Sequence, residues 1–332
     1  MFETVYFDII GGCNAKCPLC VTGRTSFGKR IEHITVENFE RTLDRLLELG
    51  LATPGKTMVG LYSWGEPILH PDLNGIAQAI ARRGLFAGLS TNASKKTSFT
   101  DSTAHFRQMI FSMPGWSQAS YDKVHGLKFD RIVSNMEASI ANMRHRGYDG
   151  RISLSFHTYQ FNIVEELPLA RDWCIKNGVV FEAYAAYIND YEPNIEYRKG
   201  TLSREKLDEI SKQLFLHYVD DLVASQPKDW VCPQWDKILT LNHRSEVLLC
   251  CVLPEGNDSY SLGSIFDLSK QQILFSKTTD KECTTCLETG VAYWAHNPMM
   301  FEVTNPPAPM QSWLRTGTTR LRAAMRQLLK AG

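Results

Sequence analysis

Three cysteines, Cys13, Cys17 and Cys20, fall within eight consecutive positions, directly after the first apolar run of the chain. Thiolate sulfur binds zinc and iron-sulfur clusters, and a closed tetrahedral site needs four protein ligands. Residues 21–32 add no further cysteine or histidine. On a cluster of four irons, three thiolates would leave one iron open to a substrate or cofactor. The spacing therefore favours an iron-sulfur site with one open position over a closed zinc site.

Five more cysteines lie in the last third of the chain and form a second set. Four of them suit a zinc ion or a fully ligated iron-sulfur cluster, because two form a CxxC pair (Cys283 and Cys286) and two lie upstream. The fifth is surplus. The ninth cysteine, Cys174, stands alone beside Trp173 in an expected helix, and we expect it to be a small buried packing residue.

Composition excludes several classes of function. The chain has 332 residues, 36 basic and 36 acidic, so no net field attracts nucleic acid or an anionic membrane. No apolar stretch is long enough to cross a bilayer, and the N-terminus MFETVYFDII lacks the basic and apolar regions of a secretion signal. We expect a cytoplasmic protein. In that reducing compartment, clustered cysteines indicate metal ligation rather than disulfides.

The scaffold for the first cysteine loop follows from hydrophobic periodicity over the first 188 residues. Apolar runs predict strands at 4–10, 56–63, 85–91, 108–113, 151–158 and 179–188. Amphipathic stretches between them predict helices at 34–50, 72–84, 129–147 and 164–178. This alternation predicts a parallel sheet, and six units fit either a partial barrel or an open doubly wound sheet. The cysteine loop would lie at the carboxyl edge of that sheet, where α/β folds bind ligands.

The alternation stops after residue 188. Residues 189–202 read as a polar linker, and residues 203–225 read as one helix. An irregular, cysteine-bearing tail follows to about residue 290. A basic amphipathic helix at 312–332 is expected to close the fold with a solvated face rather than to bind a membrane or RNA.

The motif CNAKCPLC (13–20) has the CxxxCxxC form of the radical S-adenosylmethionine (SAM) enzymes, and the first 188 residues resemble that family. YSWGEP (62–67) is similar to the family's GGEP element, with Trp64 in place of the first glycine. The usual aromatic residue before the last cysteine is replaced by Leu19. The resemblance implies a partial (β/α)6 TIM-like barrel over residues 1–188. It also implies a 4Fe-4S cluster held by the three cysteines, with S-adenosyl-L-methionine chelated to the open iron.

The resemblance further implies a set of cofactor contacts at the strand ends. In the GGEP-like element these are Gly65, Glu66 and Pro67, and Glu66 would meet the methionine ammonium group. The remaining candidates follow or end the third, fourth and fifth strands: Ser90, Asn92, Ser112, Ser155, His157 and Asn162. Each of these could instead be a polar residue satisfied at the end of a strand.

The second cysteine set resembles the auxiliary-cluster extensions of this family, called SPASM with two clusters and twitch with one. Five cysteines fit one 4Fe-4S cluster, with ligands Cys232, Cys250, Cys283 and Cys286, and a structural zinc is the alternative. Adjacent residues on a strand face opposite ways, so Cys250 and Cys251 are not expected to bind one metal together, and either could be the ligand. The other thiol, taken as Cys251, would be a packing residue or a hydrogen-atom donor.

The implied domains are a radical SAM core (1–188), a linker and helix (189–230), an auxiliary-cluster domain (231–290) and a C-terminal tail and helix (291–332). The implied reaction is reductive cleavage of SAM to a 5'-deoxyadenosyl radical, which abstracts hydrogen from a substrate C–H bond. Transfer of an electron to the auxiliary cluster would give a dehydrogenation, and hydrogen return from a thiol would give an epimerisation. The resemblance also implies a flavodoxin- or ferredoxin-type electron donor.

The compact chain favours a small polar substrate of the sugar, aminocyclitol or aminoglycoside type, with Glu182 and Tyr184 as further possible contacts. Epimerisation or crosslinking of a peptide is the alternative reaction. A non-catalytic iron-sulfur or zinc protein is the alternative from a different class of function.

Overall fold

The computed structural model describes residues 1–332 apart from 26–30, 101–104, 255–257, 298–299 and 302–332. The six predicted strands are all present. They are β1 (Thr4–Phe7), β2 (Met58–Leu61), β3 (Phe86–Thr91), β4 (Phe106–Met113), β5 (Arg151–Thr158) and β6 (Val180–Ala185). The four predicted helices between them are α2 (Val36–Glu48), α3 (Leu73–Arg82), α5 (Phe129–His145) and α6 (Glu166–Asn177). Three short helices also occur in the loops, α1 (Val21–Arg24), η2 (Pro67–Leu69) and α4 (Gln118–Lys123).

Local chemistry explains where these helices begin. At the start of α2, the Thr35 hydroxyl accepts a hydrogen bond from the Asn38 amide at 3.2 Å. This N-cap satisfies one of the free amides of the first turn, while Phe39 and Leu43 turn into the core. Pro168 is tolerated in α6 because it lies in the first turn, where its missing N–H has no helical acceptor to lose.

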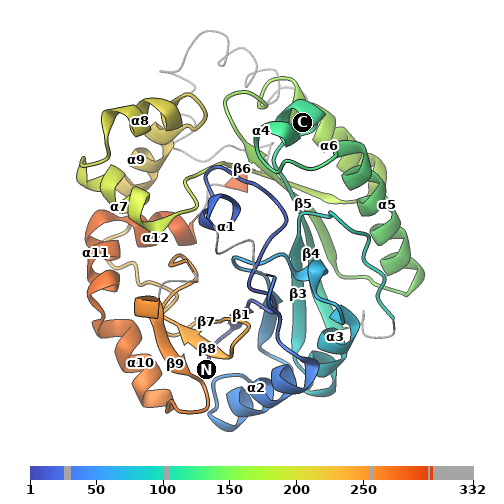
Figure 1. Ribbon diagram of the computed structural model, residues 1–332, viewed down its shortest axis with the longest axis vertical. Coiled ribbons are helices and arrows are strands. Elements are labelled where there is room, and N and C mark those ends of the chain that lie inside the picture. Colours follow the sequence, from blue (N-terminus) through green and yellow to red (C-terminus); the bar gives the residue numbers. More distant parts are fainter. Residues whose placement is uncertain (26–30, 101–104, 255–257, 298–299, 302–332) are drawn as a thin grey trace.

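The strands form one sheet in the order β10-β6-β5-β4-β3-β2-β1-β7-β8-β9, and the six strands β1 to β6 pair with one another in parallel. The sheet curves around the middle of the molecule without closing, and α2, α3, α5 and α6 cover its outside (Figure 1). The structure therefore confirms the predicted partial (β/α)6 barrel.

The segment after residue 188 is more ordered than the sequence indicates. Residues 189–202 are not a linker, because they contain the helix α7 (Tyr191–Lys199), whose Tyr191, Asn194 and Ile195 are buried. Residues 203–225 are not one helix, because α8 (Arg204–Ser211) ends before α9 (Leu216–Ala224) begins.

The cysteine-bearing tail is also regular in the described residues. It contains three strands, a short 3-10 helix, three helices and a two-residue strand: β7 (Ile238–Leu241), β8 (Glu246–Leu248), η4 (Asp258–Tyr260), β9 (Ser261–Ser264), α10 (Lys270–Thr279), α11 (Lys281–Thr289), α12 (Val291–His296) and β10 (Met300–Phe301). The expected helix at 312–332 lies outside the described residues.

The tail continues the barrel sheet instead of forming a separate sheet. Strand β7 pairs in parallel with β1, with Val5 opposite Leu239 and Phe7 opposite Leu241. Residues of β7 and β8 belong to the same hydrophobic core as those of the barrel strands. The helices α10 and α11 lie on the flank opposite α3 and α5 (Figure 1). Among the described residues, no helix combines the length and hydropathy needed to cross a membrane.

Candidate active site and metal centres

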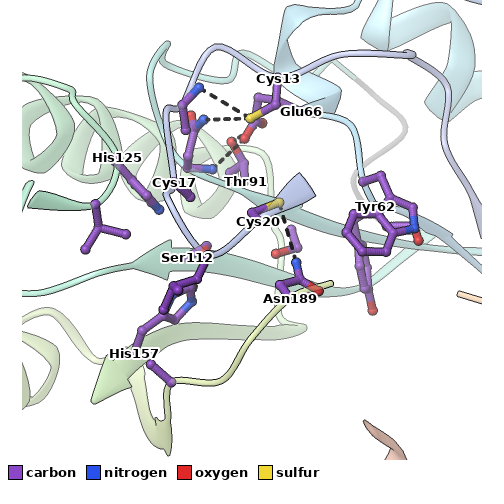
Figure 2. A pocket seen from close by; sticks show the side chains of 18 of the residues that line it. Cys13, Cys17, Cys20, Tyr62, Glu66, Thr91, Ser112, His125, His157 and Asn189 are labelled. Atoms are coloured by element: carbon purple, nitrogen blue, oxygen red, sulfur yellow. Dashed lines mark hydrogen bonds between the residues drawn. The ribbon is translucent and has the colours of Figure 1, made fainter. Parts of the chain in front are cut away.

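A cavity of about 210 Å³ lies where the loops after the barrel strands meet, and the three N-terminal cysteines line it. The same cavity is lined by most of the predicted cofactor contacts, namely Gly65, Glu66, Ser90, Asn92, Ser112 and His157. The structure thus brings together residues that are up to 176 positions apart, from Cys13 to Asn189. Figure 2 shows Cys13 beside Glu66 and Thr91, and Cys20 beside Asn189.

Hydrogen-bond donors face the sulfurs of the cysteine loop. The Ala15 backbone amide lies 3.4 Å from Cys13 Sγ, and the Asn92 side-chain amide lies 3.8 Å from the same sulfur. The Asn189 side-chain amide lies 3.6 Å from Cys20 Sγ. Burial raises the pKa of Cys13 to about 12, so this thiol stays protonated until a metal displaces its proton. Donors directed at sulfur suit thiolates that carry the negative charge of a cluster.

Glu66 is fully buried at the edge of this cavity. Its carboxylate accepts hydrogen bonds from the Thr91 hydroxyl at 2.6 Å, the Asn92 amide at 2.7 Å and the Ile68 amide at 3.3 Å. Burial raises its pKa to about 7, against the opposing effect of these hydrogen bonds. A cationic ligand in the cavity would favour the ionised form.

The sequence did not indicate how the GGEP-like element is positioned. Both carboxylate oxygens of the buried Asp8 accept hydrogen bonds from the Trp64 amide, and one accepts from the Gly65 amide at 3.0 Å. A Cβ atom at Gly65 would lie 2.1 Å from the Ile10 carbonyl oxygen. The loops after β1 and β2 therefore pack backbone against backbone. The sequence feature that could have identified Asp8 is a carboxylate at the end of an apolar strand.

Uncharged polar groups form the wall made by β4 and β5. The Ser112 hydroxyl lies 3.1 Å from His157 Nε2, and the ring of His125 is 6.3 Å from that of His157. Burial lowers the pKa of His157 to about 4 and that of His125 to about 3, so both imidazoles are neutral at pH 7. His125 was not predicted. Figure 2 shows Tyr62 across the cavity from both histidines.

Aromatic residues complete the lining. The predicted Tyr184 lies in the cavity with three further tyrosines that were not predicted: Tyr62, Tyr159 and Tyr187. The predicted Glu182 does not line the cavity and pairs with Arg151 instead.

Three predicted cofactor contacts lie outside the cavity lining. Pro67 begins the 3-10 helix η2, which Glu66 caps. Ser155 is paired across strands with Ser112 but does not line the cavity. Asn162 is fully buried, and its side chain hydrogen-bonds to the Tyr159 amide and to the Pro114 and His157 carbonyls. In this structure Asn162 holds the backbone at the end of β5.

A second, smaller cavity of about 30 Å³ is lined by the four predicted auxiliary ligands, Cys232, Cys250, Cys283 and Cys286. Cys283 and Cys286 lie three residues apart on α11, which places them on one helix face. His296 also lines this cavity, and its ring nitrogen lies within 4.8 Å of both the Cys250 and the Cys251 sulfurs. No spacing pattern in the sequence indicated His296.

The strand argument for separating Cys250 from Cys251 was wrong. Strand β8 ends at Leu248, so the two cysteines lie in a turn, and their sulfurs lie within 4.8 Å of each other. They hydrogen-bond to each other, which lowers the pKa of Cys250 and raises that of Cys251. Cys250 lines the second cavity with the other predicted ligands, whereas Cys251 does not.

Cys251 lines neither cavity but interacts with residues of both. Gln234, which lines the second cavity, donates a hydrogen bond to the Cys251 sulfur at 3.1 Å. Tyr62 and Tyr187 line the first cavity. Burial raises the pKa of both tyrosines to about 12, and Cys251 contributes to this rise. The Trp64 indole also donates to the Leu253 carbonyl at 3.1 Å, which joins the GGEP-like element to the same turn.

No family model and no curated protein matches the chain. Solved structures do match. SuiB from Streptococcus suis bound to S-adenosylmethionine is 14% identical, with 88% of this chain and 72% of that chain covered and a TM-score of 0.52. SuiB bound to its precursor peptide SuiA is 13% identical, with 88% and 70% covered and a TM-score of 0.54. Native anSMEcpe with bound AdoMet is 14% identical, with 85% and 81% covered and a TM-score of 0.53.

These neighbours are radical SAM enzymes with SPASM/twitch-type domains, and their likeness to the chain extends over the barrel and the tail. The resemblance predicted from CNAKCPLC and the GGEP-like element is therefore confirmed at the level of structure: the chain has the fold of the radical SAM enzymes.

Proposed function

We propose that this protein is a radical SAM enzyme with two 4Fe-4S clusters. The observation that carries the proposal is that Cys13, Cys17 and Cys20 line one cavity together with Glu66 and Asn92. Three thiolates would hold the first cluster, and Glu66 would accept a hydrogen bond from the ammonium group of the SAM methionine. When bound, the cluster and SAM together supply the 5'-deoxyadenosyl radical that removes hydrogen from the substrate.

The residues present fit these groups. Amide donors face the sulfurs of Cys13 and Cys20, where negative charge would reside. Glu66 already accepts hydrogen bonds from Thr91, Asn92 and Ile68, which fix its carboxylate before the cofactor binds. Four cysteines around the second cavity would fully ligate the auxiliary cluster, so that cluster would exchange electrons without binding substrate.

The lining supports a small polar substrate of the sugar, aminocyclitol or aminoglycoside type. Among the described lining residues, tyrosines and neutral histidines supply flat apolar faces and hydrogen-bonding groups, and none is a lysine or arginine. Such a wall suits hydroxyl and amine groups on a ring and offers no cation for a phosphate or carboxylate. A flavodoxin- or ferredoxin-type protein would deliver the electron, in the cytoplasm.

Modification of a peptide is the second candidate function. It is supported by the solved structures, because SuiB is bound to the precursor peptide SuiA and anSMEcpe to the Cp18Cys peptide. Both have TM-scores above 0.5 against this chain, with 70% and 81% of their lengths covered.

The role of the Cys251 thiol distinguishes two reactions. If its thiol donates a hydrogen atom to the substrate radical, the S–H bond breaks, a C–H bond forms on the opposite face, and the product is an epimer. The resulting thiyl radical would be reduced again by one electron and one proton. If the substrate radical instead transfers its electron to the auxiliary cluster and loses a proton, the product is a ketone or an imine.

We expect turnover in deuterated water to identify the reaction. An epimerase would place solvent deuterium at the inverted carbon in the wild type, because the Cys251 thiol exchanges with solvent. Cys251→Ala would lose that product, and Cys174→Ala, a buried cysteine in α6, would keep it. An oxidised, deuterium-free product from all three proteins would assign dehydrogenation and remove the donor role of Cys251.

Anaerobic reconstitution tests the proposed function as a whole. We expect about eight irons per chain and release of 5'-deoxyadenosine only when SAM and a reductant are both present. A Cys13→Ala, Cys17→Ala, Cys20→Ala variant should lose about half the iron and all cofactor cleavage, whereas Cys174→Ala should lose neither. Zinc in place of iron, with no cleavage of SAM, would instead establish a non-catalytic metal protein.

A further inference from the structure

A lysine is buried behind the second cysteine set. Lys277 lies on α10, one helical turn after the fully buried Ile273, and its relative exposure is 0%. Its ammonium group donates a hydrogen bond to the Leu249 carbonyl at 2.7 Å, one residue before Cys250. Lysine is among the residues least often fully buried, because the ammonium group loses its hydration.

The charge of Lys277 has no carboxylate partner among the residues that the structure describes. Burial lowers its pKa, and the nearby groups that act in the opposite direction are the sulfurs of Cys250, Cys251, Cys283 and Cys232. Three of these four are proposed ligands of the auxiliary cluster. A buried cation is stable only beside a compensating anion, so the cysteine set itself is the partner of this lysine.

The same helix provides a contrasting lysine. Lys270 also donates to a backbone carbonyl, that of Gly50, at 3.2 Å. It is only half-buried, and it lies two helical turns before Lys277. The two lysines thus make similar hydrogen bonds but differ in burial, and it is Lys277 that binds the residue before Cys250.

We propose that the Lys277 ammonium group sets the reduction potential of the auxiliary cluster. The inference rests on the proposed function, because it requires an iron-sulfur cluster at these cysteines. One-electron reduction adds a negative charge to a cluster whose four thiolates already make it anionic. A fixed positive charge in a region of low dielectric stabilises the reduced form more than the oxidised form. Lys277 therefore makes the cluster a better electron acceptor from a substrate radical.

A purely structural role for Lys277 would consist of its hydrogen bond to Leu249, which joins α10 to the turn after β8. Variants can separate the two roles. Lys277→Arg keeps the charge, Lys277→Gln keeps an N–H donor without the charge, and Lys277→Met keeps neither. Lys270→Met is the matched control on the same helix.

The test is a redox titration followed by electron paramagnetic resonance. All variants are made in a background with Cys13, Cys17 and Cys20 replaced by alanine, so that the auxiliary cluster is the only one present. We expect Lys277→Gln and Lys277→Met to make reduction at least tenfold less favourable, a fall in midpoint potential of about 59 mV for a one-electron couple. Lys277→Arg and Lys270→Met should stay close to the parent potential.

Equal potentials in the parent and in Lys277→Gln would overturn the proposal, as would a fall in Lys277→Met alone, which would assign the effect to the hydrogen bond. Lys277→Gln also keeps the test open if Lys277→Met fails to load iron. The iron content of the parent background distinguishes failure of this proposal from failure of the proposed function. If the parent binds zinc or no metal, the protein has no auxiliary iron-sulfur cluster, and the proposed function fails before any potential is compared.

Discussion

Glu66 is a buried carboxyl group whose proposed role requires a negative charge. Without a bound cation, burial keeps its pKa at about 7, although three hydrogen bonds favour the carboxylate. At pH 7 the site thus holds a carboxyl group that is only partly ionised until a cationic ligand arrives. This coupling makes ligand binding dependent on pH near neutrality.

For the protein without cofactor or metal, we predict that Glu66 reduces stability as the pH rises. Its pKa is raised in the folded state above the unfolded value of 4.5, so its contribution is fully present below pH 4.5 and is lost as the pH rises through about 7. The loss is about 3 kcal/mol, at ~1.4 kcal/mol per pH unit. Urea unfolding at several pH values should show Glu66→Gln gaining on the wild type between pH 4.5 and 7. Parallel pH profiles for the two proteins would contradict the assignment.

At the residue scale, the sequence predicted groups that lie close together along the chain or that follow successive strands. The first three cysteines and Glu66 are such groups, because the loops that follow the parallel strands lie at the same edge of the sheet. The hydrogen bonds of Cys251 with Gln234 and of Lys277 with Leu249 depend on contacts between distant segments. Periodicity carries no information on such contacts, so the sequence could not predict them.

The loops after β1 and β2 are the elements that determine the geometry of the first site. Asp8 binds the amides of Trp64 and Gly65, and the Glu66 amide donates to the Gly12 carbonyl at 2.9 Å. The cysteine loop and the GGEP-like element therefore share backbone contacts, and neither can move alone.

We predict that Gly65→Ala separates these loops. Its Cβ would approach the Ile10 carbonyl oxygen to 2.1 Å, and both atoms are on constrained backbone. We expect a loss of about 1–3 kcal/mol in the free energy of unfolding from overpacking, together with a severe loss of SAM cleavage. Gly88→Ala in β3 is the control, because its nearest neighbour is the flexible Met58 sulfur at 3.1 Å. Similar cleavage rates in both variants would show that the loops can move apart.

Helix α7 shows why one element was missed. The segment that begins this helix contains Asp190, Pro193 and Asn194, which are typical of turns. In the structure Asp190 precedes the helix and Pro193 lies in its first turn, where both are tolerated. The buried Tyr191 and Ile195 lie four residues apart, a helical spacing that was present in the sequence but outweighed by the turn-forming residues.

At the scale of the whole molecule, the barrel that carries the first cysteine set and the tail that carries the second share one sheet. Strand β1 lies between β2 and β7, so the barrel and the tail share hydrogen bonds as well as a hydrophobic core. The sequence indicated separate segments at residues 189–230 and 231–290, because it shows where composition changes but not which strands pair.

We predict that the tail and the barrel unfold together. If so, the amides of Leu239 and Leu241 in β7 should exchange with solvent as slowly as those of Leu154 and Phe156 in β5, with the same dependence on denaturant. Native-state hydrogen exchange on the metal-free protein measures both. Faster exchange confined to β7 would show that the tail is a separate folding unit.

The central place of β1 also affects how the protein is made. Thr4–Phe7 leaves the ribosome long before Ile238–Leu241, which is one of its two partners. Until that segment is synthesised, one edge of β1 stays open to pairing with other chains. The cysteine loop that follows β1 is thus attached to a strand whose second pairing must wait until Ile238–Leu241 has been synthesised. If Cys13, Cys17 and Cys20 hold the proposed cluster, we expect its insertion to follow the synthesis of that segment.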